Sequence, residues 1–144
     1  MSEEKIVVVY LDDEQDNLDV FSLNVPDNIH LKCYTNPQLC LEEIKELNPW
    51  IIVSDQRMPL MSGVEFLKAT KTICPQSIRL MITAYSDEDV PAQLINHNAA
   101  DGYIKKPWDG DQLVELISKY LDVYAERNIV SKFKAIYGST YGDS

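Results

Sequence analysis

Three acidic residues follow directly after an apolar run near the start of the chain. Residues 7–15 read VVVYLDDEQ, so Asp12, Asp13 and Glu14 stand side by side where an expected strand ends. Neighbouring carboxylates repel one another, and a cation placed among them removes this cost. A hard cation such as Mg²⁺ binds carboxylate oxygens at about 2.0–2.1 Å and keeps several waters. The acidic cluster therefore predicts a magnesium site that another part of the chain completes.

A third aspartate, a hydroxyl and an ammonium follow or end later apolar runs. Asp55 follows IIVS, Thr83 ends RLMIT, and Lys106 comes just after GYIK. A carboxylate can act as a nucleophile and form an acyl phosphate. A hydroxyl and an ammonium can stabilise the oxygens of the transferred phosphoryl group. Each residue alone is more often a helix cap, a turn residue or a solvated charge, but their conjunction favours phosphoryl transfer.

Short apolar runs alternate with stretches that carry helix-start signals. The expected strands are residues 6–11, 29–34, 51–54, 79–83 and 102–105. Helix starts are expected at Asn36 with Pro37, at Ser62 with Glu65, at Asp87, and at Asp109 with Gln112. The alternation predicts an α/β fold in which five strands of a mainly parallel sheet are connected by right-handed crossovers. Ligands of such sheets bind beyond the carboxyl ends of the strands, so the polar residues should meet at one edge.

Composition narrows the class of protein. A chain of 144 residues that is 45% hydrophobic suffices for one domain with a core. Its net charge of −10 argues against binding to nucleic acid or anionic membranes, and no apolar run approaches the ~20 residues of a membrane span. Cys33, Cys40 and Cys74 are odd in number and lack metal-ligand spacing. They are expected to be reduced thiols of a cytoplasmic protein.

Four motifs in order resemble the receiver domain of two-component response regulators, in the CheY-like superfamily. They are YLDDEQDNL, SDQRMPLMSGVEFL, LMITAYSD and GYIKKPWD, and the match covers about residues 5 to 122. The resemblance implies a doubly wound (βα)5, flavodoxin-like fold in three α/β/α layers over residues 1–124. It implies a domain that phosphorylates and dephosphorylates itself and has no separate substrate, rather than an enzyme. Residues 125–144 are expected to form a helical extension with a disordered end, as a linker or interaction segment.

The resemblance also implies roles for individual residues. Asp55 corresponds to the phosphoacceptor, and Asp13 and Asp55 correspond to direct ligands of Mg²⁺, for which Mn²⁺ can substitute. Asp12 corresponds to a ligand that acts largely through water. The backbone carbonyl of Arg57 corresponds to the third protein ligand.

Further roles concern the phosphoryl group and the conformational switch. Lys106, rather than Lys105, corresponds to the lysine that contacts the phosphoryl oxygens, because it directly precedes the proline. Thr83 corresponds to the switch hydroxyl, and Tyr103 to the switch aromatic that turns inward. The sequence departs from the family where Ala99 replaces a glycine, and Asn98 is expected to take the left-handed conformation there.

The implied partner is a sensor histidine kinase or a phosphotransfer protein that carries a phosphohistidine. It is expected to contact Leu18, Pro107 and Trp108. The end of the chain carries two apolar sets on different helical faces. The first, suited to the sheet, is Leu113, Ile117, Tyr120 and Tyr124; the second is Ile129, Val130, Phe133, Ile136 and Tyr137. The second set leaves open a fold-back, a homodimer or a following output domain.

Several functions other than a receiver that stands alone are compatible with parts of the sequence. The chain could be the input domain of a longer regulator, for example one with a cyclic-di-GMP phosphodiesterase output, or a receiver fold used only for protein binding. A haloacid-dehalogenase-like, Mg-dependent phosphatase needs Asp-x-Asp-x-Thr, whereas this chain has Asp-Asp-Glu-Gln-Asp. A flavodoxin-like flavin binder needs a Ser/Thr/Gly-rich loop after the first strand, where acids would repel the phosphate. The intact set of site residues favours a phosphorylatable receiver.

Overall fold

The strands form one parallel sheet, as predicted. The computed structural model describes residues 5–84, 98–106 and 108–137, and of residues 130–137 the backbone only. The strands are β1 (Ile6–Leu11), β2 (Ile29–Tyr34), β3 (Ile51–Asp55), β4 (Ile78–Thr83) and β5 (Gly102–Lys105). They lie side by side in the order β2-β1-β3-β4-β5, and every pairing is parallel. The order requires crossovers, so helices cover both faces of the sheet.

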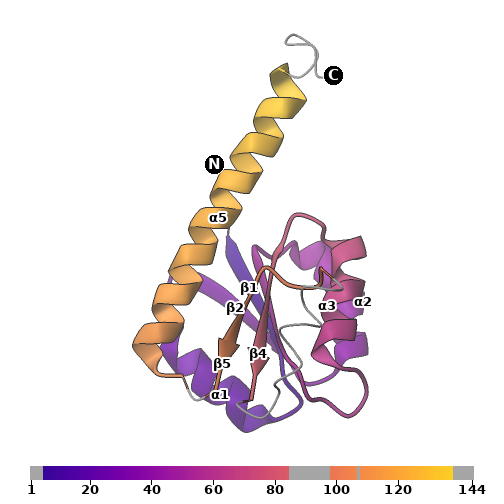
Figure 1. Cartoon of the computed structure of the whole chain (residues 1–144), viewed down its shortest axis with the longest axis vertical. Coiled ribbons are helices and arrows are strands. Elements are labelled where there is room, and N and C mark those ends of the chain that lie inside the picture. The colour runs from indigo at the N-terminus through magenta and orange to yellow at the C-terminus, as the bar shows by residue number, and fades with distance from the viewer. Residues whose placement is uncertain (1–4, 85–97, 107, 138–144) are drawn as a thin grey trace.

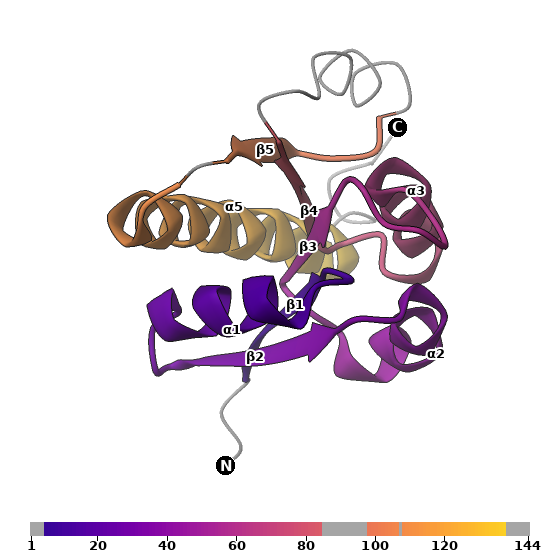
Figure 2. The same ribbon diagram turned by 90° about the horizontal axis from the view of Figure 1, so that it is seen from below.

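The described helices cover the two faces in pairs. They are α1 (Gln15–Asn24), α2 (Pro37–Leu47), α3 (Gly63–Ile73) and α5 (Gly110–Tyr137). Figure 1 shows α2 and α3 on one side of the sheet and α5 on the other, and Figure 2 shows α1 beside α5. This arrangement confirms the predicted three-layer α/β/α fold. The helix predicted to begin near Asp87 lies outside the described residues.

Side-chain caps fix three of the helix starts that the sequence predicts. The side chain of Asn36 accepts hydrogen bonds from the first turn of α2, and Ser62 Oγ accepts one from the Glu65 N–H. Asp109 and Gln112 form a reciprocal capping box at the start of α5. Such caps each contribute about 1 kcal/mol to stability. Asn98 has a φ of 49°, which confirms the predicted left-handed residue.

The core lies in two layers because β1, β3 and β4 are buried on both faces. Alternate residues of β1 enter different clusters: Val7 and Val9 pack toward α2 and α3, whereas Val8 and Tyr10 pack toward α1 and α5. The continuous apolar run of β1 is therefore explained by burial on both sides.

The predicted stripe of α5 packs on the sheet. Leu113, Ile117 and Tyr124 are at most 7% exposed, and the ring of Tyr124 stacks on Trp50 with the centroids 4.6 Å apart. Beyond the stripe the helix continues to Tyr137, so no turn within these residues folds the second apolar set back. Ile129, the one member of that set whose side chain is described, is 66% exposed.

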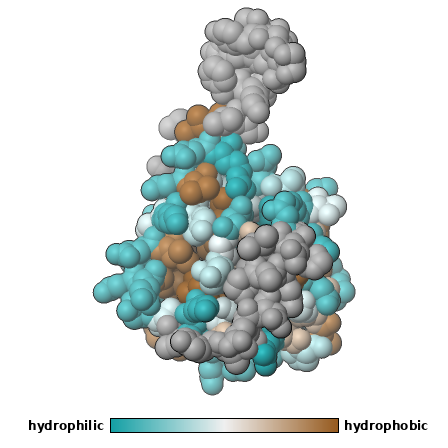
Figure 3. Space-filling view, viewed as in Figure 1, coloured by the Kyte–Doolittle hydropathy of each residue, from teal (hydrophilic) through white to brown (hydrophobic). Residues whose placement is uncertain are grey.

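The surface view agrees with this arrangement. Figure 3 shows hydrophobic patches along α5 between hydrophilic side chains. Among the described helices, none combines the length and the apolar character needed to cross a membrane.

Two leucines of α1 have opposite environments. Leu18 is 2% exposed and belongs to the core, whereas Leu23 is 85% exposed. The expectation that Leu18 contacts a partner directly is therefore not retained, because its side chain lies beneath the surface of α1. The apolar side chains that α1 offers to a partner are Val20 and Leu23.

The two leucines give a matched test of the core. Leu18→Ala should lower the free energy of unfolding by about 2–5 kcal/mol, because it leaves a cavity. Leu23→Ala should change it by no more than about 0.5 kcal/mol, because the side chain is exposed. Urea unfolding followed by circular dichroism measures both values. Equal midpoints for the two variants would contradict the assignment of Leu18 to the core.

Candidate functional site

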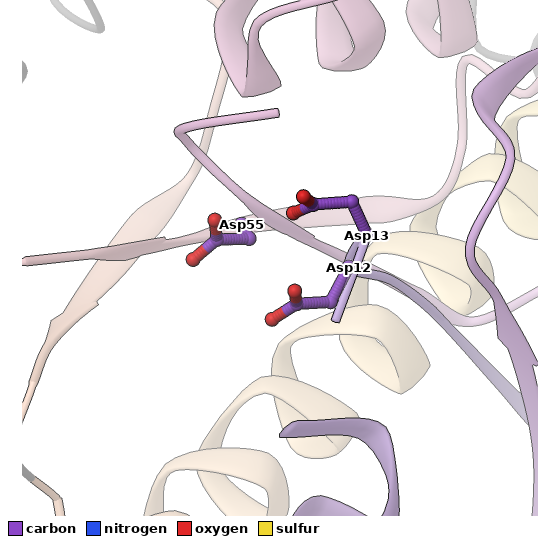
Figure 4. Close-up of side chains that lie close together, drawn as sticks. All are labelled: Asp12, Asp13 and Asp55. Atoms are coloured by element: carbon purple, nitrogen blue, oxygen red, sulfur yellow. The ribbon is translucent and has the colours of Figure 1, made fainter. Parts of the chain in front are cut away.

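Three carboxylates meet at the carboxyl edge of the sheet. Asp12 and Asp13 follow β1 directly, and Asp55 is the last residue of the adjacent strand β3. One oxygen from each of these side chains lies within 4.8 Å of the others. Figure 4 shows the side chains close together at the ends of the two strands. The structure thus brings together the three aspartates that the sequence analysis singled out.

The donor set fits a hard divalent cation. Asp12 and Asp55 are buried and Asp13 is exposed, so the cluster is open on the side of Asp13. All three donors are carboxylate oxygens, which Mg²⁺ and Mn²⁺ prefer over softer ligands. Arg57 lies two positions beyond Asp55, in the loop that leads to α3, and its side chain is exposed.

Asp12 is held by three hydrogen bonds. Its Oδ2 accepts from the Tyr10 hydroxyl at 2.8 Å and from Asn17 Nδ2 at 3.1 Å, and its Oδ1 accepts from the Glu14 N–H at 3.0 Å. Burial raises the pKa of Tyr10, and the nearby Asp12 carboxylate raises it further, so the phenol stays protonated as a donor. These bonds occupy most of the roughly four acceptor positions of a carboxylate. Asp12 is therefore less available than Asp13 as a direct metal ligand.

Asp55 is paired with Lys106, whose Nζ lies 3.0 Å from Asp55 Oδ1. Burial nevertheless raises the pKa of Asp55. The hydrogen bond from Lys106 lowers it, while the negative charges of Asp12 and Asp13 raise it. Desolvation is the largest cause, so one ammonium does not offset the cost of an ionised Asp55 at this position. A bound cation would supply the missing positive charge.

Thr83 lies on β4 and Tyr103 on β5, the two strands that follow β3 in the sheet. Thr83 ends β4, is 1% exposed, and accepts a backbone hydrogen bond from the Lys106 N–H at 2.8 Å. This bond ties the residue after β5 to the end of β4. Tyr103 lies on β5 and is 44% exposed, so its ring is on the surface in this conformation.

The segment after Asp55 is fastened to the start of α3. The Gln56 carbonyl accepts from the Gly63 N–H at 2.9 Å, and Gln56 Oε1 accepts from the Val64 N–H at 3.1 Å. A Cβ at Gly63 would meet the carbonyl oxygen of Asp55 and would lie 2.7 Å from the sulfur of Met81. Only glycine allows this close approach.

The residues that support the site were not predicted from the sequence. Tyr10 lies two positions before Asp12, on the same face of the chain leaving β1. This spacing could have predicted that the two side chains lie close together. Asn17 and Gln56 carried no comparable signal, because their bonds depend on how the loops after β1 and β3 turn.

Of the two predicted partner contacts after β5, the structure describes only Trp108. Trp108 is partly buried, and its ring packs edge-on against Phe21 with the centroids 6.2 Å apart. It is therefore part of the rim of the core beside α1. Pro107 lies outside the described residues.

Comparison with known proteins identifies the same family. The sequence model of the response regulator receiver domain matches residues 7–118. The hydrogenase transcriptional regulatory protein HoxA of Bradyrhizobium diazoefficiens is 45% identical over 74 residues, which cover 51% of this chain and 15% of that protein. The DNA-binding transcriptional regulator NtrC of Escherichia coli is 34% identical over 99 residues, which cover 67% of this chain and 21% of that protein. The chain thus matches only a small part of these longer relatives.

Solved structures share the fold. An uncharacterised protein from Neptuniibacter caesariensis superposes with a TM-score of 0.82 at 25% identity, covering 88% of this chain and 95% of that one. A CheY-like response regulator receiver domain protein from Methanospirillum hungatei gives a TM-score of 0.78 at 22% identity, covering 85% and 98%. The family match over residues 7–118 favours the receiver over the phosphatase alternative. With a family match over residues 7–118 and the predicted fold confirmed, the chain belongs to the response regulator receiver domain family.

Proposed function

We propose that Asp55 accepts a phosphoryl group from the phosphohistidine of a histidine kinase or phosphotransfer protein, in a reaction that requires Mg²⁺. Asp13, Asp55 and the backbone carbonyl of Arg57 would hold the ion directly, and Asp12 would act through water. The observation that carries this proposal is the group of three carboxylates within 4.8 Å, with Lys106 bonded to Asp55. When bound, the ion would neutralise charge on the carboxylates and on the phosphoryl oxygens.

In the transfer step, an oxygen of Asp55 attacks phosphorus. The bond from phosphorus to the imidazole nitrogen of the donor breaks, and its electron pair remains on that nitrogen. The product is an acyl phosphate on Asp55. The phosphorylated state ends when water attacks phosphorus: the bond from phosphorus to the Asp55 oxygen breaks, inorganic phosphate is released, and the carboxylate is restored. The transfer step needs Asp55 ionised, and Lys106 supports that state with a hydrogen bond of 3.0 Å.

Lys106 and Thr83 would stabilise the phosphorylated state. The side chain of Lys106 is 35% exposed, so it has the freedom to move from Asp55 to a phosphoryl oxygen. The hydroxyl of Thr83, at the end of the adjacent strand, would donate to another phosphoryl oxygen. Movement of Thr83 would leave space for Tyr103 to turn inward from its exposed position. The altered surface around β5 is the signal.

We propose that the output domain, which would respond to phosphorylation, lies outside the receiver domain. HoxA and NtrC are transcriptional regulators several times longer than the part matched by this chain, which supports a role as the input domain of a longer regulator. The extension of α5 beyond Tyr124 is the proposed connection. The exposed Val20 and Leu23 of α1 would take part in docking the phosphodonor.

Phosphorylation can be tested without the cognate kinase. Wild-type protein incubated with acetyl phosphate and Mg²⁺ should gain the mass of one phosphoryl group, measured by intact-protein mass spectrometry. Asp55→Asn should gain none, because the nucleophilic carboxylate is lost. Asp27→Asn, which changes an exposed aspartate just before β2 and outside the acidic cluster, should behave as wild type. Labelling of Asp55→Asn to the wild-type extent would refute the assignment of the acceptor.

Stability gives an independent test of the metal site. Since burial raises the pKa of Asp55 above its value in the unfolded chain, Asp55 costs stability above the raised pKa, and the cost disappears as the pH falls through it. At neutral pH in EDTA, Asp55→Asn should therefore have a higher Tm than the wild type. Mg²⁺ at one hundred times its Kd should stabilise the wild type by about 2.7 kcal/mol.

Calorimetry of the wild type, Asp55→Asn and Asp27→Asn, each with and without Mg²⁺, measures these effects. Asp55→Asn should gain much less from Mg²⁺ than the other two proteins. A lower Tm for Asp55→Asn in EDTA, or an equal gain from Mg²⁺ in all three, would speak against the site.

A further inference from the structure

A polar pocket lies at the opposite edge of the sheet from Asp55. Arg79 is near the amino end of β4, and Asp101 comes just before β5, so both lie far along the strands from the acidic cluster. The pocket has a volume of about 230 Å³. It is lined by Lys71 of α3, Pro75 just beyond that helix, Arg79, residues 98–101, and Arg127 of α5.

The charge of this pocket is opposite to that of the protein. Lys71, Arg79 and Arg127 bring three positive charges to its wall, and Asp101 brings one negative charge. The chain as a whole carries a net charge of −10. Asp101 pairs with Arg127, whose Nη2 lies 3.1 Å from its Oδ1. Among the residues that the structure describes around the pocket, the three cations therefore outnumber the one carboxylate.

Arg79 is the most buried of these cations, with only 4% of its surface exposed. Its guanidinium donates to the carbonyls of Cys74 at 2.8 Å and Pro75 at 3.4 Å, which hold it in place but carry no charge. Burial lowers the pKa of Arg79; Asp101 partly offsets this effect, and the positive charge of Arg127 adds to it. A buried charge of this kind is stabilised by an anion.

The other walls of the pocket are held in position. Lys71 Nζ donates to the Asn98 carbonyl at 3.0 Å, and the Asp101 carboxylate accepts from the backbone N–H of Arg79 at 2.9 Å. The hydroxyl of Tyr120 donates to the Asp101 carbonyl at 3.4 Å. These bonds join α3, the segment before β5, and α5 around the pocket. The cations are therefore arranged before any ligand arrives.

We propose that this pocket binds a small, doubly charged oxyanion of the phosphate class, either inorganic phosphate or a small phosphomonoester. Guanidinium groups bind phosphate oxygens through paired N–H donors, and a lysine adds a point charge. The volume is below the roughly 300–1,000 Å³ of pockets for drug-sized ligands, so it suits a small anion. Binding here does not require Asp55 to be a phosphoacceptor, because the two sites lie at opposite edges of the sheet.

Titration with inorganic phosphate in EDTA, followed by ¹⁵N–¹H NMR against sodium chloride of equal ionic strength, tests the proposal. The amides of Lys71, Arg79 and residues 98–101 should shift in a saturable manner in phosphate and not in chloride. Lys71→Gln and Arg127→Gln should each raise the Kd about tenfold or more, because each removes a charged hydrogen-bond donor. Lys68→Gln removes a positive charge from an exposed position of α3 outside the pocket, and it should leave the Kd unchanged.

A parallel titration with methyl phosphate distinguishes the two sources of the anion. Tighter binding than inorganic phosphate would support a phosphomonoester, and weaker binding would support free phosphate. The proposal is overturned if no saturable shifts occur near the pocket in either titration. It is also overturned if Lys68→Gln weakens binding as much as Lys71→Gln and Arg127→Gln do, because the effect would then be one of net charge alone.

Discussion

The constraint on which the rest of the site depends is the crowding of three carboxylates at the end of two buried strands. Asp12, Asp13 and Asp55 place oxygens within 4.8 Å of one another, and the ammonium of Lys106 is 3.0 Å from one of them. Desolvation raises the pKa of Asp55 in spite of that ammonium. The folded protein without a cation therefore holds an electrostatic cost, which binding of Mg²⁺ would relieve. In the proposed function, this cost would make Asp55 responsive to metal binding and to phosphoryl transfer.

The parallel sheet is what creates and supports this crowding. Since all strands point the same way, β1 and β3 deliver their following acids to one edge, and β4 and β5 deliver Thr83 and Lys106 to the same edge. Hydrogen bonds from Tyr10 and Asn17 fix Asp12, and Gln56 fastens the segment after Asp55 to α3. Among the described residues, the amino edge has the reverse character, with three cations and one acid around a pocket. The two edges would thus attract ions of opposite charge.

Much of this architecture could be predicted from the sequence, because the relevant signals are local. Apolar runs located every strand to within one residue at either end, and cap residues such as Asn36 and Ser62 located helix starts. The acidic cluster followed from strand ends in a parallel sheet. What could not be predicted depends on tertiary packing. The burial of Leu18, the bonds of Asn17 and Gln56, and the pocket around Arg79 arise from segments that are distant in the sequence.

The central claim is that Asp13 and Asp55 share one divalent ion. A crystal structure of the protein soaked with Mn²⁺, with anomalous diffraction to locate the metal, tests it most directly. We expect one anomalous peak between these two carboxylates, within bonding distance of an oxygen from each and of the Arg57 carbonyl. A peak elsewhere, or none between the two aspartates at saturating Mn²⁺, would contradict it.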